Sequence, residues 1–328
     1  MATKSKNRET LILVLALLIT SGVLGLALWY FQLFPKVIQN TGSPNQINNE
    51  QSSDSQPQPI QSFNLASLDT SLPNPNVLTI DGSVTIITLV KQLQIAHNVA
   101  NPYLPTTYGL PDGRPNGTNA GLKNLIDGKV LMAASSRPLN SSELQAGLVG
   151  VPIARDALAV AVGINNPYQG ELTIEQLRGI FQGQITDWSE VGGPKLPIKV
   201  INRSRDSGTR TFFQEAVLSG QPFAPDGGNF STVEQDETTP ILRALGNDGI
   251  SYSTVTQIEN QKTVRIIPIN GISPTDKIAV ENGTYPISRV VYLAVPRKTS
   301  PAVKQFADLA KSPPGQQAIQ RAGFIPLQ

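Results

Sequence analysis

The sequence predicts an α/β protein of two lobes with mixed β-sheets, preceded by one N-terminal transmembrane helix and a disordered linker. From Val77 to the C-terminus, runs with strand periodicity alternate with runs of helical periodicity, which is typical of layered α/β folds. This part holds about 250 residues, more than one hydrophobic core usually supports, and two lobes are therefore favoured. Upstream of it, a long apolar span is followed by a polar stretch.

The apolar span, residues 11–34, reads "LILVLALLITSGVLGLALWYFQLF" and carries no charge over 24 positions. A helix of about 20 apolar residues crosses a bilayer, so we expect a transmembrane signal anchor. Its end carries Trp29, Tyr30 and Phe31, which suit a membrane interface better than the small residues of a cleavage site do. A cleaved signal peptide is the alternative.

Basic residues in the segment 1–10 place that segment in the cytoplasm by the positive-inside rule. The folded part is then expected on the periplasmic side of the plasma membrane, attached by a single span. Residues 35–76 are rich in Pro, Gln, Asn and Ser and predict a disordered linker.

Composition excludes several kinds of chemistry. The chain has no cysteine, so disulfides, thiolate chemistry and Cys-ligated metals are excluded. Its single histidine, His97, rules out a multi-histidine metal site, and we expect it to be solvated near a helix C-terminus. Residues 1–36 carry four basic and one acidic side chain, and the remaining 22 basic and 23 acidic residues nearly cancel, which argues against nucleic-acid binding.

The elements of the folded part follow from periodicity. A strand at 77–81 leads to a helix at 84–97, on which Ile86, Leu89 and Leu93 share one face with Val90. Further strands are expected at 130–135, 156–164, 198–202, 249–255, 264–270 and 288–295. Further helices are expected at 120–128, 173–183, 209–218, 301–311 and 313–322. We expect lobe 1 to comprise 77–157 and 288–328, and lobe 2 to comprise 158–287.

Short polar turns follow several strands or precede helices, at 81–85, 116–121, 135–137 and 202–209. Ligands of open α/β sheets bind beyond the carboxyl ends of the strands. A helix N-terminus offers unpaired N–H groups and partial positive charge, and Ser and Thr add hydroxyls. Several such turns together would bind an anion without metal or cofactor, although ordinary N-capping explains any single one.

The most specific turn is "NRSRDSGTR", residues 202–210. Arg203 precedes the triplet Ser207, Gly208 and Thr209, and an arginine can hold an oxyanion through two parallel hydrogen bonds. Asp206 either orients that arginine or caps the following helix.

The longer stretch "INRSRDSGTRTFF" resembles the Arg-x-x-x-Ser-Gly-Thr signature of the phosphate-binding proteins of bacterial ABC importers, within the type II periplasmic binding protein superfamily. Other segments resemble the family in the same order along the chain: "IDGSVT", "NGTNAGLKNLIDGKVLMAASSRPLNSSEL", "LTIEQLRGIFQGQITDWSEVGG", "GISY" and "GFIPL". The resemblance covers residues 77–328. The anchored start and the Pro/Gln linker are similar to those of cyanobacterial members.

The resemblance implies two lobes that close on one anion, with no catalytic residue, no metal and no cofactor. It assigns phosphate-binding roles to Ser83, Thr85, Thr118, Ser136, Arg203, Ser207, Gly208 and Thr209. Asn119, Arg137 and Asp206 are weaker candidates.

Two positions depart from the family pattern. Many members have an aspartate where this chain has Ser136, and that carboxylate accepts the proton of hydrogen phosphate. The acid that supports the binding arginine usually lies two residues after it, where this chain has Arg205, and Asp206 is then the substitute. Serine before the arginine also occurs in the family, so phosphate remains the expected ligand, with weaker selectivity over other tetrahedral oxyanions; which of them binds is left open by the sequence.

The predicted function is that of a membrane-anchored solute-binding protein, not an enzyme, which delivers phosphate to the permease and ATPase of an ABC importer. A tethered phosphate sensor or buffer acting on a membrane partner would use the same site and stays open. An extracytoplasmic hydrolase is the weakest alternative, because the turns contain no carboxylate pair and the chain has one histidine.

Overall fold

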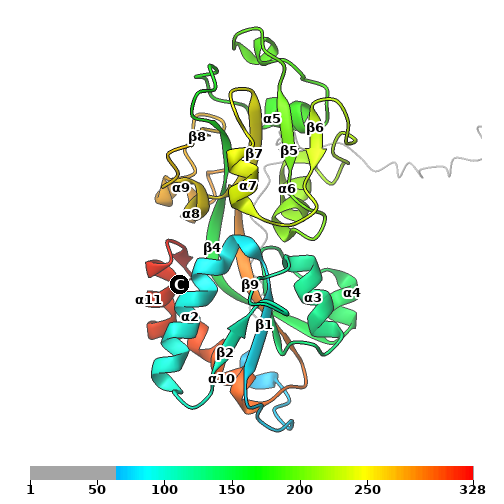
Figure 1. The fold of residues 1–328 in the computed structure, drawn as a ribbon. Helices are drawn as coiled ribbons and strands as arrows, with labels where there is room; N and C mark the ends of the chain where they lie inside the picture. Colours follow the sequence, from blue (N-terminus) through cyan, green and yellow to red (C-terminus); the bar gives the residue numbers. More distant parts are fainter. Residues whose placement is uncertain (1–63, 328) are drawn as a thin grey trace, which may run out of the picture. The chain divides into compact units, whose positions relative to one another are not determined.

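Residues 64–327, which the computed structural model describes, form an α/β fold around ten strands (Figure 1). They belong to one compact unit, Pro57–Gln328. The predicted transmembrane span 11–34 and the predicted linker up to residue 63 lie outside the described residues. Within the described range, none of the helices combines the length and the hydropathy that a membrane span requires.

We use "first lobe" for the elements around strands β1, β2 and β3. Its parallel strands run in the order β2-β1-β3 and continue into antiparallel β9 and β4. The strands are β1 (Leu78–Gly82), β2 (Thr106–Tyr108), β3 (Met132–Ser135), β9 (Ser288–Pro296), β10 (Ile325–Pro326) and the first half of β4 (Leu148–Gly163). One face carries the helices α2 (Ile87–Ala100), α10 (Pro301–Lys311) and α11 (Pro313–Arg321), and the other carries α3 (Thr118–Ile126) and α4 (Ser141–Gln145).

We use "second lobe" for the elements around β5 and β7. Here the second half of β4 pairs with β7 and β8, and β5 joins β7 to β6. The strands are β5 (Lys199–Asn202), β6 (Phe230–Thr232), β7 (Gly249–Thr254) and β8 (Val264–Ile267). The helices are α5 (Ile174–Phe181), α6 (Gly208–Leu218), α7 (Thr238–Arg243), α8 (Val255–Ile258) and α9 (Lys277–Glu281).

Strand β4 joins the two lobes. Its residues 148–157 pair with β9, and its residues 158–163 pair with β7 and β8. The sequence predicted that this strand begins at residue 156, whereas it begins at Leu148. The prediction missed the first half because Gly150, Pro152 and a bulge between Pro152 and Ala154 interrupt the apolar pattern there. Each other predicted strand and helix is present within a few residues of its expected bounds.

The elements that periodicity missed are short, and their formation depends on distant partners. Strand β2, for example, has three residues and pairs with β1, and β6 has three residues and pairs with β5. The structured chain also begins before Val77. Residues 65–67 form a 3₁₀ turn, and Leu65 and Leu68 are buried in the core of the first lobe.

His97 is buried in that same core, so the expectation of a solvated histidine is wrong. It lies one helical turn after Leu93 and therefore on the apolar face of α2, where its ring centroid is 5.2 Å from that of Phe306. Its Nε2 has no hydrogen-bond partner, and Asn101 Nδ2 lies 3.5 Å from Nδ1.

This burial predicts a pH dependence of stability. Burial lowers the pKa of the His97 imidazole, so at mildly acid pH the unfolded chain binds a proton that the folded chain does not. The free energy of unfolding is therefore expected to fall as the pH drops below about 6.5, the ordinary histidine pKa. Urea unfolding at pH values above and below about 6.5 should show this loss in the wild type and a smaller loss in His97→Gln. Equal losses in both proteins would contradict the assignment.

Candidate functional site

The four predicted polar turns come together between the two lobes. Ser83 and Thr85 follow β1, Thr118 begins α3, and Ser136 follows β3, all in the first lobe. The N-terminus of α6 in the second lobe brings the triplet 207–209 to them. The hydroxyl-bearing residues of this group are no more than 1% exposed: Ser83, Thr85, Thr118, Ser136, Ser207 and Thr209.

Five of these hydroxyls form a continuous chain, which we call the hydroxyl cluster: Ser83, Thr85, Thr118, Ser136 and Thr209. Thr85 Oγ1 lies 2.9 Å from Ser83 Oγ and 3.0 Å from Thr209 Oγ1. Ser136 Oγ lies 3.0 Å from Thr118 Oγ1 and 3.5 Å from Thr209 Oγ1. The cluster thus joins both lobes, and Tyr108 fixes the first turn by donating its hydroxyl to the Ser83 carbonyl.

Glycine at position 208 is required by the close approach of α6 to α3. A Cβ atom on Gly208 would lie 2.4 Å from Thr118 Oγ1 and 2.8 Å from Ser136 Oγ, closer than atoms can pack. The first turn of α6 therefore presents its backbone directly to the hydroxyl cluster. Unpaired N–H groups at such a helix start favour negative charge.

Arg203 directly follows strand β5, and its guanidinium is fully buried. Nε donates to Ser207 Oγ at 3.0 Å, and Nη2 donates to Asp236 Oδ1 at 2.6 Å. Nη1 donates to Thr238 Oγ1 at 3.0 Å. Arg203 thus lies beside the helix start and has a buried partner of opposite charge.

The acid that supports Arg203 is Asp236, so the expectation that Asp206 orients this arginine is wrong. Asp206 is exposed, whereas the Arg203 side chain is fully buried and pairs with Asp236. Asp206 does not cap α6 either, because Ser207 Oγ accepts the hydrogen bond from the Arg210 amide.

Sequence reasoning missed a second buried arginine, Arg289 on β9. Its Nε and Nη2 donate to Asp156 Oδ2 at 2.9 and 2.7 Å. Nη1 donates to Thr209 Oγ1 at 2.8 Å, and Nη2 donates to Thr85 Oγ1 at 3.2 Å. Arg289 therefore contacts two members of the hydroxyl cluster, one from each lobe.

The sequence contained a signal for this pair. An arginine begins the apolar strand "SRVVYLAV" and an aspartate begins the apolar strand "DALAVAVGI", and Asp156 lies opposite Arg289 in the register of the two strands. Charges of opposite sign at the starts of two buried strands indicate a pair, since a buried charge needs a partner. Burial lowers the pKa of Arg289, but a guanidinium remains protonated in proteins.

The weaker candidates Asn119 and Arg137 make contacts of another kind. Arg137 forms a bidentate pair with Glu143, at 2.7 and 2.9 Å, and its Nε donates to Asn119 Oδ1. Asn119 Nδ2 donates to the Arg205 carbonyl at 2.9 Å, and its amide donates to the Asp206 carbonyl at 3.0 Å. These two residues connect the first lobe to the turn before α6.

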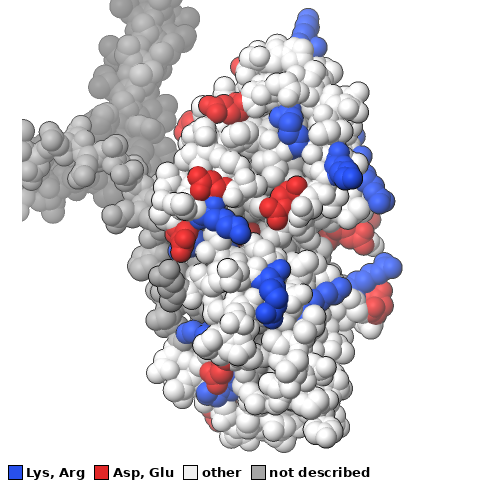
Figure 2. All heavy atoms as spheres, turned by 90° about the vertical axis from the view of Figure 1, so that its left-hand side faces the viewer, with Lys and Arg blue, Asp and Glu red and all other residues white. Residues whose placement is uncertain are grey.

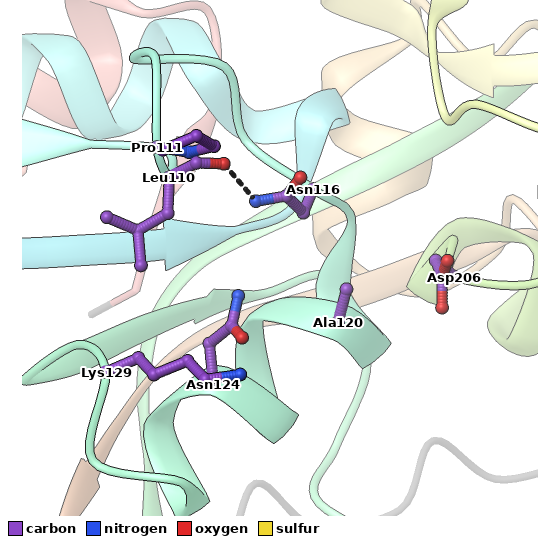
Figure 3. A pocket seen from close by; sticks show the side chains of 7 residues that line it. All are labelled: Leu110, Pro111, Asn116, Ala120, Asn124, Lys129 and Asp206. Carbon is purple, nitrogen blue, oxygen red and sulfur yellow. Dashed lines mark hydrogen bonds between the residues drawn. The ribbon is translucent and has the colours of Figure 1, made fainter.

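A cavity of about 490 Å³ lies beside this turn and is separate from the hydroxyl cluster (Figure 3). Asp206 is the only predicted site residue that lines it, together with Leu110, Pro111, Asn116, Ala120, Asn124 and Lys129. Because its lining includes neither buried arginine, we place the candidate site at the hydroxyl cluster. On the protein face shown in Figure 2, basic and acidic side chains of the described residues are interspersed.

Comparisons with known proteins identify the family of the chain. The sequence profile of the PBP superfamily domain matches residues 69–313. The phosphate-binding protein PstS of Pseudomonas aeruginosa is 31% identical over 238 residues, 64% of this chain and 72% of that protein. PstS of Borreliella burgdorferi is 27% identical over 271 residues, 78% of this chain and 91% of that protein. The structure is similar to that of a putative phosphate ABC transporter substrate-binding protein with bound phosphate from Clostridium perfringens, with TM-score 0.68, 28% identity, and coverage of 77% of this chain and 100% of that chain.

Proposed function

The chain belongs to the PBP superfamily, among the phosphate-binding proteins, and on that premise we propose that it binds inorganic phosphate between its two lobes. The observation that carries the proposal is the convergence of the hydroxyl cluster, the N-terminus of α6 and a buried, paired Arg203 at one place. A tetrahedral oxyanion needs many donors in a small volume, and this constellation supplies them.

Each part of the site has a role in this proposal. Arg203 supplies positive charge, and Asp236 fixes its guanidinium. The amides of Gly208 and Thr209, in the first turn of α6, supply donors aligned with the helix dipole. The five hydroxyls complete the shell, with Ser83, Thr85, Thr118 and Ser136 reaching the ligand from the first lobe.

We propose that the lobes are residues 77–157 with 288–328 and residues 158–287, and that the site closes when they meet. Hydrogen bonds between the two sides support this. Thr85 contacts Thr209, and Gln257 Nε2 donates to the Val84 carbonyl at 3.0 Å. Gln257 Oε1 also accepts from Thr238 Oγ1, which holds Arg203. A closed, dry site strengthens each electrostatic contact with the ligand.

The proposed role is delivery of phosphate to an ABC importer from the extracytoplasmic side, with residues 11–34 as a membrane anchor. The similarity to the Clostridium perfringens ABC transporter substrate-binding protein supports the transport role, and the 24-residue uncharged span supports the anchor. We propose binding without chemical conversion, because the chain's single histidine lies in the core of the first lobe.

Calorimetric titration of the full-length chain with inorganic phosphate tests the function. We expect micromolar affinity or better, about −8 kcal/mol, and no effect of a metal chelator because the proposed donors are protein groups alone. Nitrate, a planar monoanion, serves as the control and should bind far more weakly. If phosphate gives no binding, and neither does any other tetrahedral oxyanion, the proposed function fails.

A further inference from the structure

The buried charges near the hydroxyl cluster already balance. Arg203 is paired with Asp236 and Arg289 is paired with Asp156, each at 2.7 Å or less. All four side chains are at least nine-tenths buried. Burial and, to a smaller extent, the positive charge of Arg203 lower the pKa of Arg289, while the carboxylate of Asp156 stabilises its charged form.

The buried carboxylates of this part of the fold already accept hydrogen bonds from protein groups. Asp156 Oδ2 accepts two hydrogen bonds from Arg289, and Asp156 Oδ1 accepts one from Thr254. Asp236 accepts from Arg203. The other two buried carboxylates of the described residues, Asp81 and Glu143, accept from asparagine side chains and from Arg137 respectively.

The groups of the hydroxyl cluster differ from carboxylates in one decisive way. A hydroxyl both donates and accepts, so it can bind a ligand oxygen whether or not that oxygen carries a proton. An ionised carboxylate only accepts, and it repels a ligand oxygen that has no proton to donate. Ser136, within 3.5 Å of both Thr118 and Thr209, places a neutral hydroxyl in the middle of the cluster.

We propose that the site recognises tetrahedral oxyanions by shape and negative charge and not by protonation, so that it binds sulfate and arsenate as well as phosphate. The inference rests on the proposed function, which places the ligand at the hydroxyl cluster. Arg289 contributes to it as a second guanidinium, because it donates to Thr85 and Thr209 of the cluster. Arg203 donates to Ser207 at the start of α6, and neither guanidinium needs a proton on the ligand.

The ratio between the phosphate and sulfate affinities tests this inference. A site that hydrogen-bonds a particular ligand hydrogen rejects analogues that lack it by about 10⁴-fold or more, whereas a permissive site discriminates by about 10²-fold. A ratio of about 10³ between the phosphate and sulfate affinities therefore separates the two cases.

The experiment is calorimetric titration of the full-length chain at neutral pH with phosphate, sulfate and arsenate in turn. We expect the sulfate affinity to lie within about 10³-fold of the phosphate affinity. Phosphate binding with a larger preference over sulfate would overturn this inference and leave the proposed function standing. No binding of any of the three anions would overturn both.

A matched pair of variants tests whether the uncharged Ser136 side chain is the reason for weak discrimination between phosphate and sulfate. Ser136→Asp adds a charge that repels sulfate but accepts the proton of hydrogen phosphate, so the phosphate-to-sulfate ratio should rise by about 10²-fold or more. Ser136→Asn adds a side chain of similar size without charge, and its ratio should stay within about tenfold of the wild type. Because both affinities are measured on one sample, partial misfolding cancels from the ratio. An unchanged ratio in Ser136→Asp would contradict the inference.

Discussion

Arg203→Ala is expected to weaken phosphate binding by about 2–5 kcal/mol, a factor of about 30 to several thousand. The guanidinium is fully buried and donates to Ser207, Asp236 and Thr238. Its removal takes away the positive charge beside the start of α6 and leaves Asp236 buried without its cation, an unfavourable neighbour for an anion.

Phosphate titration by calorimetry measures the effect, and circular dichroism checks folding. Arg205→Ala and Arg210→Ala are the matched controls from the same turn. Arg205 is exposed, and the Arg210 guanidinium lies 4.3 Å from the centroid of the Phe223 ring. Both substitutions should cost less than about 1 kcal/mol of phosphate binding, because Arg205 is an exposed charge and the half-buried Arg210 places its guanidinium on the Phe223 ring. If Arg205 or Arg210 proves the sensitive position, the site has been placed on the wrong arginine. Arg203→Lys, which keeps the charge, covers the case in which the alanine variant does not fold.

Arg289→Gln is expected to weaken phosphate binding by about 2–5 kcal/mol as well, although Arg289 lies far from every predicted turn in the sequence. The substitution removes a buried guanidinium that donates to Thr85 and Thr209, and it leaves Asp156 without its cation. Negative charge would then increase at the proposed anion site.

The control is Arg155→Gln, on the same strand as Asp156 and one residue before it. Side chains alternate along a strand, so Arg155 points away from Arg289, and it is only half-buried. Its substitution should change the phosphate affinity by less than about 1 kcal/mol. Full phosphate affinity in a folded Arg289→Gln variant would show that Arg289 only holds the strands together. Arg289→Lys should retain part of the affinity, because the charge remains beside Asp156.

The longer elements of the fold could be predicted because local periodicity defines them. The α2 face formed by Leu89, Val90 and Leu93 is buried as its spacing indicated. Helix α6 begins at the Ser-Gly-Thr triplet because a serine cap and a glycine are local signals. For the same reason, the polar turns that carry the hydroxyl cluster could be found from the sequence alone.

Other features depend on which segments the fold brings together. Arg203 and Asp236 are 33 positions apart in the sequence, and Arg289 and Asp156 are 133 positions apart. No local pattern connects residues at these separations. The Arg289 pair forms because β4 pairs with β9, and the Arg203 pair forms because the segment before α7 lies beside the end of β5. Asp206, the nearest acid in the sequence, was the natural choice as partner of Arg203, but Asp206 is exposed and the buried arginine pairs with Asp236.

The sequence by itself indicated an α/β chain of two lobes with polar turns that carry hydroxyl side chains and a helix start. These properties reside in short segments, whose backbone conformation follows from the residues they contain. The tertiary structure decided how the site is charged: it paired Arg203 with Asp236, brought Arg289 and Asp156 to the hydroxyl cluster, and buried His97. Burial and ion pairing depend on what packs against a residue, and that is fixed only when the sheets assemble.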